Sequence, residues 1–257
     1  ELPEFTTDYM DAAYSDAKVE YGGESHGLKM SKIFNLVKKT IAMGGNISIF
    51  GSPGSGKTTL LENLAASLTR GTERYKVLMV PANVVAALKS PDNVAALINE
   101  VAQEREMGYK VILIIDEAEM LLAKSENGVH SENNTFMLQL LDGTLKKELG
   151  VATVLVFNTK IENLNPALFR AMRMAMVPIY LTPLDEDRAR NLVKQLKRNL
   201  PGKVFDGAKF ESILKNENAL TDGTVYANQG EISLADVYSC FLDQDFRNAI
   251  EGVLTPT

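Results

Sequence analysis

Residues 51–58 read Gly51-Ser52-Pro53-Gly54-Ser55-Gly56-Lys57-Thr58 and match the pattern G-x-x-x-x-G-K-[ST] at every fixed position. The apolar run 47–50 before them predicts a short buried strand, and leucines recur at helical spacing from Leu60 to Leu68 after them. A strand, a glycine-rich turn and a helix start form a phosphate cradle, because glycines let backbone N–H groups turn inward on an anion and the helix N-terminus carries partial positive charge. The stretch therefore predicts a binding site for a nucleoside triphosphate.

Two side chains of this phosphate loop (residues 51–59) have distinct expected roles. The Lys57 ammonium would reach the β- and γ-phosphates of ATP, and the Thr58 hydroxyl would bind Mg²⁺. The alternative is a glycine turn with a chance lysine, which the flanking strand and helix patterns disfavour. The residues expected to bind the nucleotide are Gly51, Pro53, Gly54, Ser55, Gly56, Lys57, Thr58 and Thr59.

A second motif, VILIIDEAEM at 111–120, is an apolar run that ends in two carboxylates. Buried parallel strands deliver such residues to their carboxyl ends, where open α/β sheets bind ligands. We expect Asp116 to hold Mg²⁺ and Glu117 to polarise the water that attacks the γ-phosphate. The alternative is an exposed turn at a strand end, which the complete phosphate loop upstream disfavours.

A third apolar run, 153–157, ends at Asn158. An asparagine at such a point is usually a turn former. Beside a γ-phosphate its amide could instead hold the attacking water or sense the phosphate, which makes Asn158 a candidate catalytic residue. The choice depends on the strand order, so both interpretations stay open from the sequence alone.

Composition and charge restrict the class of protein. The chain has 257 residues, enough for one large and one small domain, and its 45% apolar content is ordinary for a globular protein. A net charge of −6 argues against wholesale nucleic-acid binding, and no apolar run approaches a membrane-spanning length. A single cysteine, Cys240, fits a reducing compartment, and the polar, acidic first residues do not resemble a secretory signal. We expect a cytoplasmic protein without membrane insertion.

The apolar runs and the helical patterns between them predict an α/β fold of the P-loop NTPase kind, an open parallel sheet of about five strands with helices on both faces. We expect a leader or linker over 1–27, the nucleotide-binding α/β domain over 28–182, and a small all-helical lid domain over 183–257. The expected strands lie at 47–50, 77–80, 111–115, 153–157 and 177–181. Helices are expected at 28–42, 184–198, 206–215, 231–241 and 243–253.

Taken in order, these motifs resemble those of the AAA+ ATPase superfamily, and of its AAA branch more than of the helicase-loader or initiator branches. The resemblance covers roughly residues 28–253. FMLQLLDG (136–143) is similar to the family's LLxxLDG helix, and VLVFNTKIENLNPALFRAMR (154–173) to its segment from sensor 1 to the arginine fingers. PLDEDRARNLV (183–193) resembles the start of the family's lid, and GEISLADV (230–237) its GADI segment.

The resemblance implies an ATPase that works without DNA or RNA, in a ring or helical assembly of its own copies, usually six, with nucleotide between neighbours. Arg170 and Arg173 keep the three-residue spacing of the family's arginine fingers, which reach the next subunit's γ-phosphate. Ala171-Met172 stands between them where the family has Pro-Gly. The division of roles between the two arginines therefore stays open, and a solvated helix end is the alternative for both.

One departure from the family bears on the substrate. Members that thread proteins carry an aromatic residue in a pore loop after the second strand, whereas Leu88-Lys89-Ser90 stands at that point here. Ordinary unfolding by threading is therefore disfavoured. We expect an oligomeric, Mg²⁺-dependent ATPase that remodels a macromolecular partner, a protein in preference to DNA. The alternative is an ATP-switched assembly or adaptor protein that forms rings or filaments on DNA or on a protein partner.

Overall fold

The structure is a computed structural model that describes residues 11–14, 17–21, 24–69, 74–81, 84, 91–119, 139–141, 143–158, 176–215 and 231–243. The chain divides into two compact units. The sheet unit comprises residues 16–52 and 57–181. The C-terminal unit comprises residues 182–257 together with 1–15 and the tip of the phosphate loop, Pro53–Gly56.

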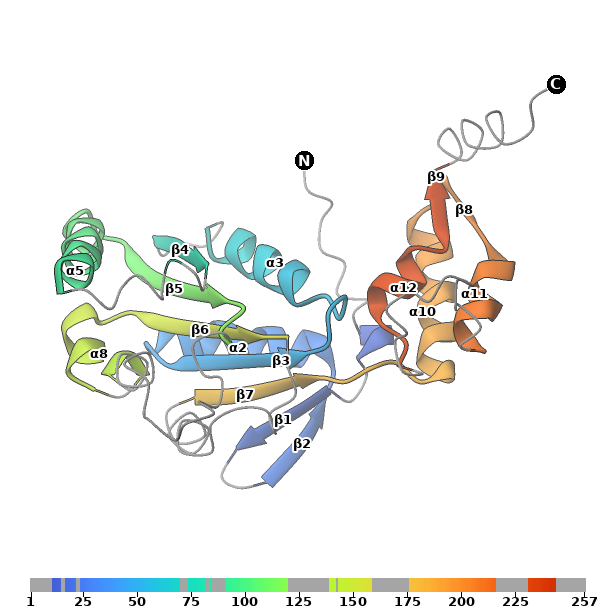
Figure 1. The fold of residues 1–257 in the computed structure, drawn as a ribbon, viewed down its shortest axis with the longest axis horizontal. Helices are drawn as coiled ribbons and strands as arrows, with labels where there is room; N and C mark the ends of the chain where they lie inside the picture. The colour runs from blue at the N-terminus through green and yellow to red at the C-terminus, as the bar shows by residue number, and fades with distance from the viewer. Residues whose placement is uncertain are drawn as a thin grey trace, which may run out of the picture. The chain divides into compact units, whose positions relative to one another are not determined.

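A seven-stranded sheet forms the centre of the sheet unit (Figure 1). Its strands are β1 (Ala17–Tyr21), β2 (Glu24–Leu28), β3 (Asn46–Gly51), β4 (Tyr75–Pro81), β5 (Lys110–Asp116), β6 (Ala152–Phe157) and β7 (Met176–Leu181). They lie in the order β2-β1-β7-β3-β6-β5-β4. All pairings from β7 to β4 are parallel, so the five expected strands and their open parallel sheet are confirmed.

Strands β1 and β2 correct the expectation for the first part of the chain. They form an antiparallel hairpin. Strand β1 also pairs antiparallel with β7, the outermost strand of the parallel part of the sheet. Ala17 and Val19 are buried while Lys18 between them is exposed, which is the alternation of a half-covered strand. Residues 17–21 and 24–28 are therefore strands and not part of an irregular leader. Their polar composition, with β2 exposed at four of its five positions, concealed the strands.

Helices cover both faces of this sheet, as expected (Figure 1). They are α2 (Met30–Ala42), α3 (Lys57–Thr69), α5 (Pro91–Glu106) and α8 (Thr144–Leu149). Alternate residues of β5 pack in one core with Leu97 of α5 and Leu145 of α8. The β5 residues between them, Ile112 and Ile114, are buried as well, so apolar layers lie on both sides of the strand.

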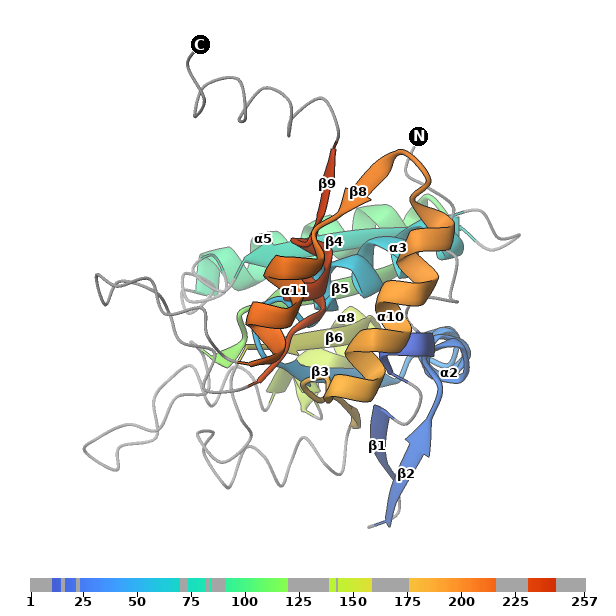
Figure 2. The same cartoon turned by 90° about the vertical axis from the view of Figure 1, so that its right-hand side faces the viewer.

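From residue 182 on, the described residues of the C-terminal unit form three helices and a two-stranded ribbon (Figure 2). These are α10 (Glu186–Asn199), β8 (Lys203–Phe205), α11 (Gly207–Leu214), α12 (Leu234–Tyr238) and β9 (Phe241–Asp243). Each helix begins at a side chain that accepts a backbone N–H: Asp185, Asp206 and Ser233.

The helices expected at 184–198 and 206–215 are confirmed, and the one expected at 231–241 is shorter. The antiparallel pair β8–β9 shows that this unit is not all-helical. Each of its strands has three residues, too few for a period to be recognised. Of the helix expected at 243–253, only the first residue is described, and it is the last residue of β9. Residues 244–253 lie outside the described part of the chain. Within the described part of the chain, no helix has the length and apolarity that crossing a bilayer requires.

Candidate nucleotide site

The phosphate loop leaves the end of β3 and enters α3, whose first residue is Lys57. Its start, Gly51, ends a strand that is buried from residue 46 to residue 50, and Thr58 and Thr59 lie in the first turn of α3. Backbone φ is +78° at Gly54 and +85° at Gly56, a region that side chains disfavour. The loop therefore has the strand–turn–helix context that its sequence predicts, with glycine where the backbone requires it.

Lys57 is buried, with 6% of its surface exposed. Its Nζ donates hydrogen bonds to the carbonyl oxygens of Gly51 and Ser52, both at 2.8 Å. Burial lowers the pKa of Lys57, and the carboxylates of Asp116 and Glu119 act in the opposite direction. The sheet unit thus brings one buried amine into the field of two carboxylates at the end of β5.

The carboxyl end of β5 carries a strained turn. Asp116 is half-buried, and its Oδ1 accepts the backbone N–H of Glu117 at 2.9 Å. Glu117 is exposed and has a φ of +53°, although it has a full side chain. A left-handed conformation costs a non-glycine residue about 1–2 kcal/mol. Such strain concentrates at functional sites, where it aims a side chain that a relaxed turn would point elsewhere.

Asn158 follows β6 directly and is half-buried. Because β6 lies between β3 and β5, the strand order places Asn158 at the carboxyl ends of the strands, between the phosphate loop and the two carboxylates. Its backbone N–H donates to Glu119 Oε2 at 3.1 Å. The Ala118 N–H donates to the Val156 carbonyl at 2.9 Å, which continues the pairing of β5 and β6 beyond Asp116. Glu119 is a residue that the sequence interpretation missed, and the third acidic residue of DEAE was its signal.

In the C-terminal unit, the loop tip has two partners from distant parts of the chain. The Ala235 N–H donates to the Gly54 carbonyl at 3.0 Å, and the Tyr14 hydroxyl donates to the Ser55 carbonyl. Tyr14 is completely buried. The sequence interpretation missed it because it lies in the expected leader, and a lone tyrosine there carries no motif.

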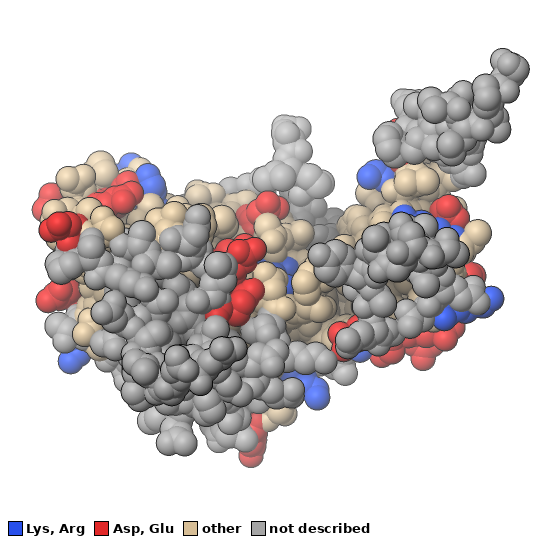
Figure 3. Space-filling model, viewed as in Figure 1, with Lys and Arg blue, Asp and Glu red and all other residues tan. Residues whose placement is uncertain are grey.

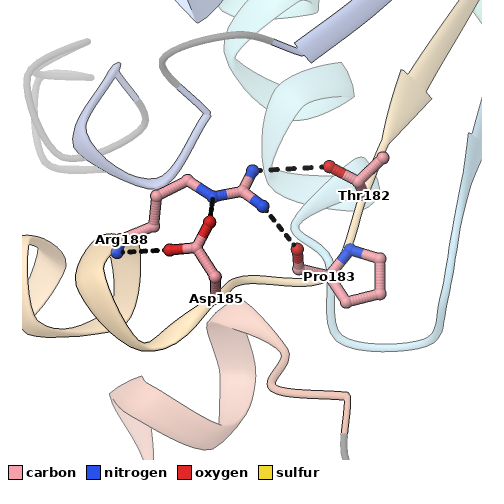
Figure 4. A network of polar contacts seen from close by, with 4 residues as sticks. All are labelled: Thr182, Pro183, Asp185 and Arg188. Carbon is pink, nitrogen blue, oxygen red and sulfur yellow. Dashed lines mark hydrogen bonds and ion pairs between the residues drawn. The ribbon is translucent and has the colours of Figure 1, made fainter.

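A further polar network stabilises the start of α10 (Figure 4). Arg188 Nε donates to Asp185 Oδ2 at 2.8 Å, and its terminal nitrogens donate to the Pro183 carbonyl and the Thr182 hydroxyl. The Arg188 backbone N–H also donates to Asp185, which lowers the pKa of that carboxyl. The network fixes the chain just after β7 to the first turn of α10.

Three predicted features lie outside the described residues: Arg170, Arg173 and the pore-loop position 88–90. Their predicted roles stay predictions.

Comparison with known proteins identifies the family of the chain. The model of the ATPase family associated with various cellular activities (AAA) matches residues 47–179. The chain belongs to this family. Membership supports nucleotide binding and ATPase activity in general, and it agrees with the phosphate loop and the sheet described above.

Among solved structures, the chain is similar to one from the E. coli MS115-1 HORMA:CdnC:Trip13 complex. The two are 18% identical with a TM-score of 0.53, and the match covers 87% of this chain and 72% of that chain. At this identity the likeness shows a shared fold. No curated protein matches the chain significantly.

Proposed function

We propose that this AAA protein hydrolyses ATP with Mg²⁺ at the phosphate loop, and that hydrolysis drives the remodelling of a protein partner. The observation that carries the proposal is the buried Lys57 amine at a left-handed glycine turn. Its Nζ donates to two loop carbonyls, and burial lowers the pKa of the amine. A phosphate would replace those neutral acceptors with charged ones, which form stronger hydrogen bonds.

The residues at the strand ends fit a magnesium–nucleotide complex by their chemistry. Oxygen ligands suit Mg²⁺, and the Thr58 hydroxyl and the Asp116 carboxylate would hold it, where it would neutralise charge on the phosphates. Glu117 would accept a proton from the attacking water. Its exposed carboxylate, held by a left-handed backbone, suits a group that must face a substrate. Asn158, at the neighbouring strand end, would orient the same water.

We further propose that the site is completed by a second copy of the chain. Arg170 and Arg173 would act on the γ-phosphate bound by a neighbour, since guanidinium stays charged and offers several donors to phosphate oxygens. Specific activity should then rise with protein concentration as copies assemble. An Arg173→Ala or Arg170→Ala protein should recover part of its activity when it is mixed with Glu117→Gln, because an intact glutamate site can then face an intact arginine. Activity that is independent of concentration, with no recovery on mixing, would contradict a shared site.

Two observations favour a protein partner over DNA. The net charge is −6, and acidic and basic side chains are interspersed among the described residues on the face in Figure 3. The structurally similar chain comes from a complex with HORMA and CdnC. Phosphate release measured with and without duplex DNA separates the two partner classes. Little change with DNA is expected, and strong stimulation by DNA would favour an ATP-switched assembly on DNA instead.

A further inference from the structure

We propose that Tyr14 is a positioning residue of the phosphate loop, which orients backbone N–H groups toward the phosphates from outside the loop. The proposal rests on the proposed ATP site. Its basis is that two successive loop carbonyls are each held by a hydrogen bond from a distant segment. Ala235 N–H bonds to the Gly54 carbonyl, and the Tyr14 hydroxyl bonds to the Ser55 carbonyl.

Peptide geometry turns these two bonds into a constraint on the neighbouring amides. The described peptide bonds are all trans, and in a planar trans peptide the C=O of one residue points opposite to the N–H of the next. Fixing the Gly54 carbonyl therefore fixes the Ser55 N–H in the opposite direction. Fixing the Ser55 carbonyl does the same for the Gly56 N–H. These are the kind of successive amides that form an anion-binding nest.

The environment of Tyr14 makes its hydroxyl a dependable donor. The side chain is completely buried, and Ser55 is 1% exposed, so water does not compete for the bond. Burial strongly raises the pKa of Tyr14, and the nearby Arg188 charge only partly opposes this. The phenol therefore remains neutral at physiological pH and keeps the proton that it donates.

The α12 side of the loop is equally well defined. Ser233 and Asp236 form a reciprocal cap at the start of α12: the Asp236 N–H donates to Ser233 Oγ at 3.1 Å, and the Ser233 N–H donates to Asp236 Oδ2 at 2.8 Å. Ala235 lies in the first turn of this helix, where N–H groups lack partners within the helix, and it donates to Gly54 instead. A Cβ on Gly54 would lie 2.9 Å from the Ala235 Cβ and from Ser233 Oγ. The close approach therefore needs glycine for space as well as for its backbone angle.

The test is Tyr14→Phe, which removes the hydroxyl and keeps the ring. Dissociation constants for ATP, ADP and inorganic tripolyphosphate are measured by calorimetry, together with the melting temperature of the free protein. We expect all three ligands to bind about 2- to 12-fold more weakly, the effect of one net hydrogen bond. Tyr75→Phe, at a buried tyrosine that begins β4, is the matched control and should leave all three constants unchanged.

The alternative roles of Tyr14 give different patterns. Weaker binding of ATP and ADP with unchanged tripolyphosphate binding would mean that Tyr14 acts on the nucleoside, and a lower melting temperature with unchanged constants would mean a structural role. Either result overturns the proposal. Failure of the wild-type protein to bind any of the three ligands would instead refute the ATP site itself.

A second pair of variants tests the α12 contact, and with it the proposal, independently of Tyr14. Gly54→Ala and Gly44→Ala both place a side chain at positive φ, +78° and +71°, but no atom lies within 4 Å of a Cβ on Gly44. We expect Gly54→Ala to weaken tripolyphosphate binding at least about tenfold more than Gly44→Ala, because it also displaces the carbonyl that orients the loop. Equal binding by the two variants would overturn the proposal.

Discussion

Replacing Lys57 with methionine should separate the affinity for ATP from the stability of the free protein. The wild-type amine is buried and donates to the carbonyls of Gly51 and Ser52 at 2.8 Å. Methionine has an unbranched, flexible side chain that fills similar space, so the substitution removes mainly the charge and its donors.

The loss of affinity follows from the number of charged hydrogen bonds. A hydrogen bond to a charged group contributes about 1.5–3 kcal/mol. If Lys57 donates to one β- and one γ-phosphate oxygen, its removal costs about 3–6 kcal/mol, which is a loss of roughly 10²- to 10⁴-fold in affinity.

The free protein should respond differently. Burial lowers the pKa of Lys57, so the folded state disfavours the charged amine more than the unfolded state does. Methionine removes this cost, and the two carbonyl groups that lose the Lys57 donor belong to residues that are only half-buried, Gly51 and Ser52. The free energy of unfolding should therefore stay within about 1 kcal/mol of the wild-type value.

Titration with a fluorescent ATP analogue measures the first quantity, and urea unfolding without nucleotide measures the second. Lys38→Met is the matched control, because Lys38 donates to Ser67 between α2 and α3 and should leave the affinity unchanged. Unchanged affinity in Lys57→Met would refute the phosphate-loop site. A large fall in stability that accounts for the lost binding would refute the argument from burial.

Two further substitutions test other parts of the structure. Lys146→Met should lower the free energy of unfolding by about 1–3 kcal/mol. Unlike Lys57, Lys146 donates from Nζ to two acceptors on buried residues, the Val151 carbonyl and Asn46 Oδ1, and also to the Gly44 carbonyl. Burial lowers the pKa of Lys146 to about 8, so its amine is still protonated at pH 7. Exposed Lys147→Met is the control, and equal melting curves would contradict the prediction. Asp116→Asn should weaken the dependence of ATP-analogue binding on Mg²⁺, since the amide loses the charge that attracts the ion. Titration with and without EDTA measures this, and an unaltered Mg²⁺ dependence would exclude Asp116 as a ligand.

The parallel part of the fold could be predicted because its signals are local. Each central strand is buried on both faces, so it reads as a continuous apolar run, and the phosphate loop is fixed by glycine conformation and by its flanking elements. The hairpin β1–β2 at one end of the sheet and the ribbon β8–β9 could not be predicted in this way. They are short and partly exposed, and only pairing with distant residues defines them.

The residues of the candidate site also fall into two groups, those that local sequence signals indicate and those that only contacts with distant residues define. Lys57, Asp116, Glu117 and Asn158 stand next to strand ends, where sequence position alone indicates where they lie. Glu119 bonds to the backbone of a residue 39 positions away, and Tyr14 to one 41 positions away. A backbone partner leaves no pattern in the sequence, because any residue type supplies it.

The most direct test of the ATPase proposal compares wild type with Glu117→Gln in binding and in turnover. Both proteins are titrated with a fluorescent ATP analogue, and steady-state phosphate release is measured at a concentration where activity per subunit no longer rises. Glu106→Gln, the same change at the exposed end of α5, is the control. We predict equal binding by all three, with phosphate release by Glu117→Gln at least about 100-fold slower than by wild type and the control. Phosphate release by Glu117→Gln at the wild-type rate, or none by wild type, would contradict the account.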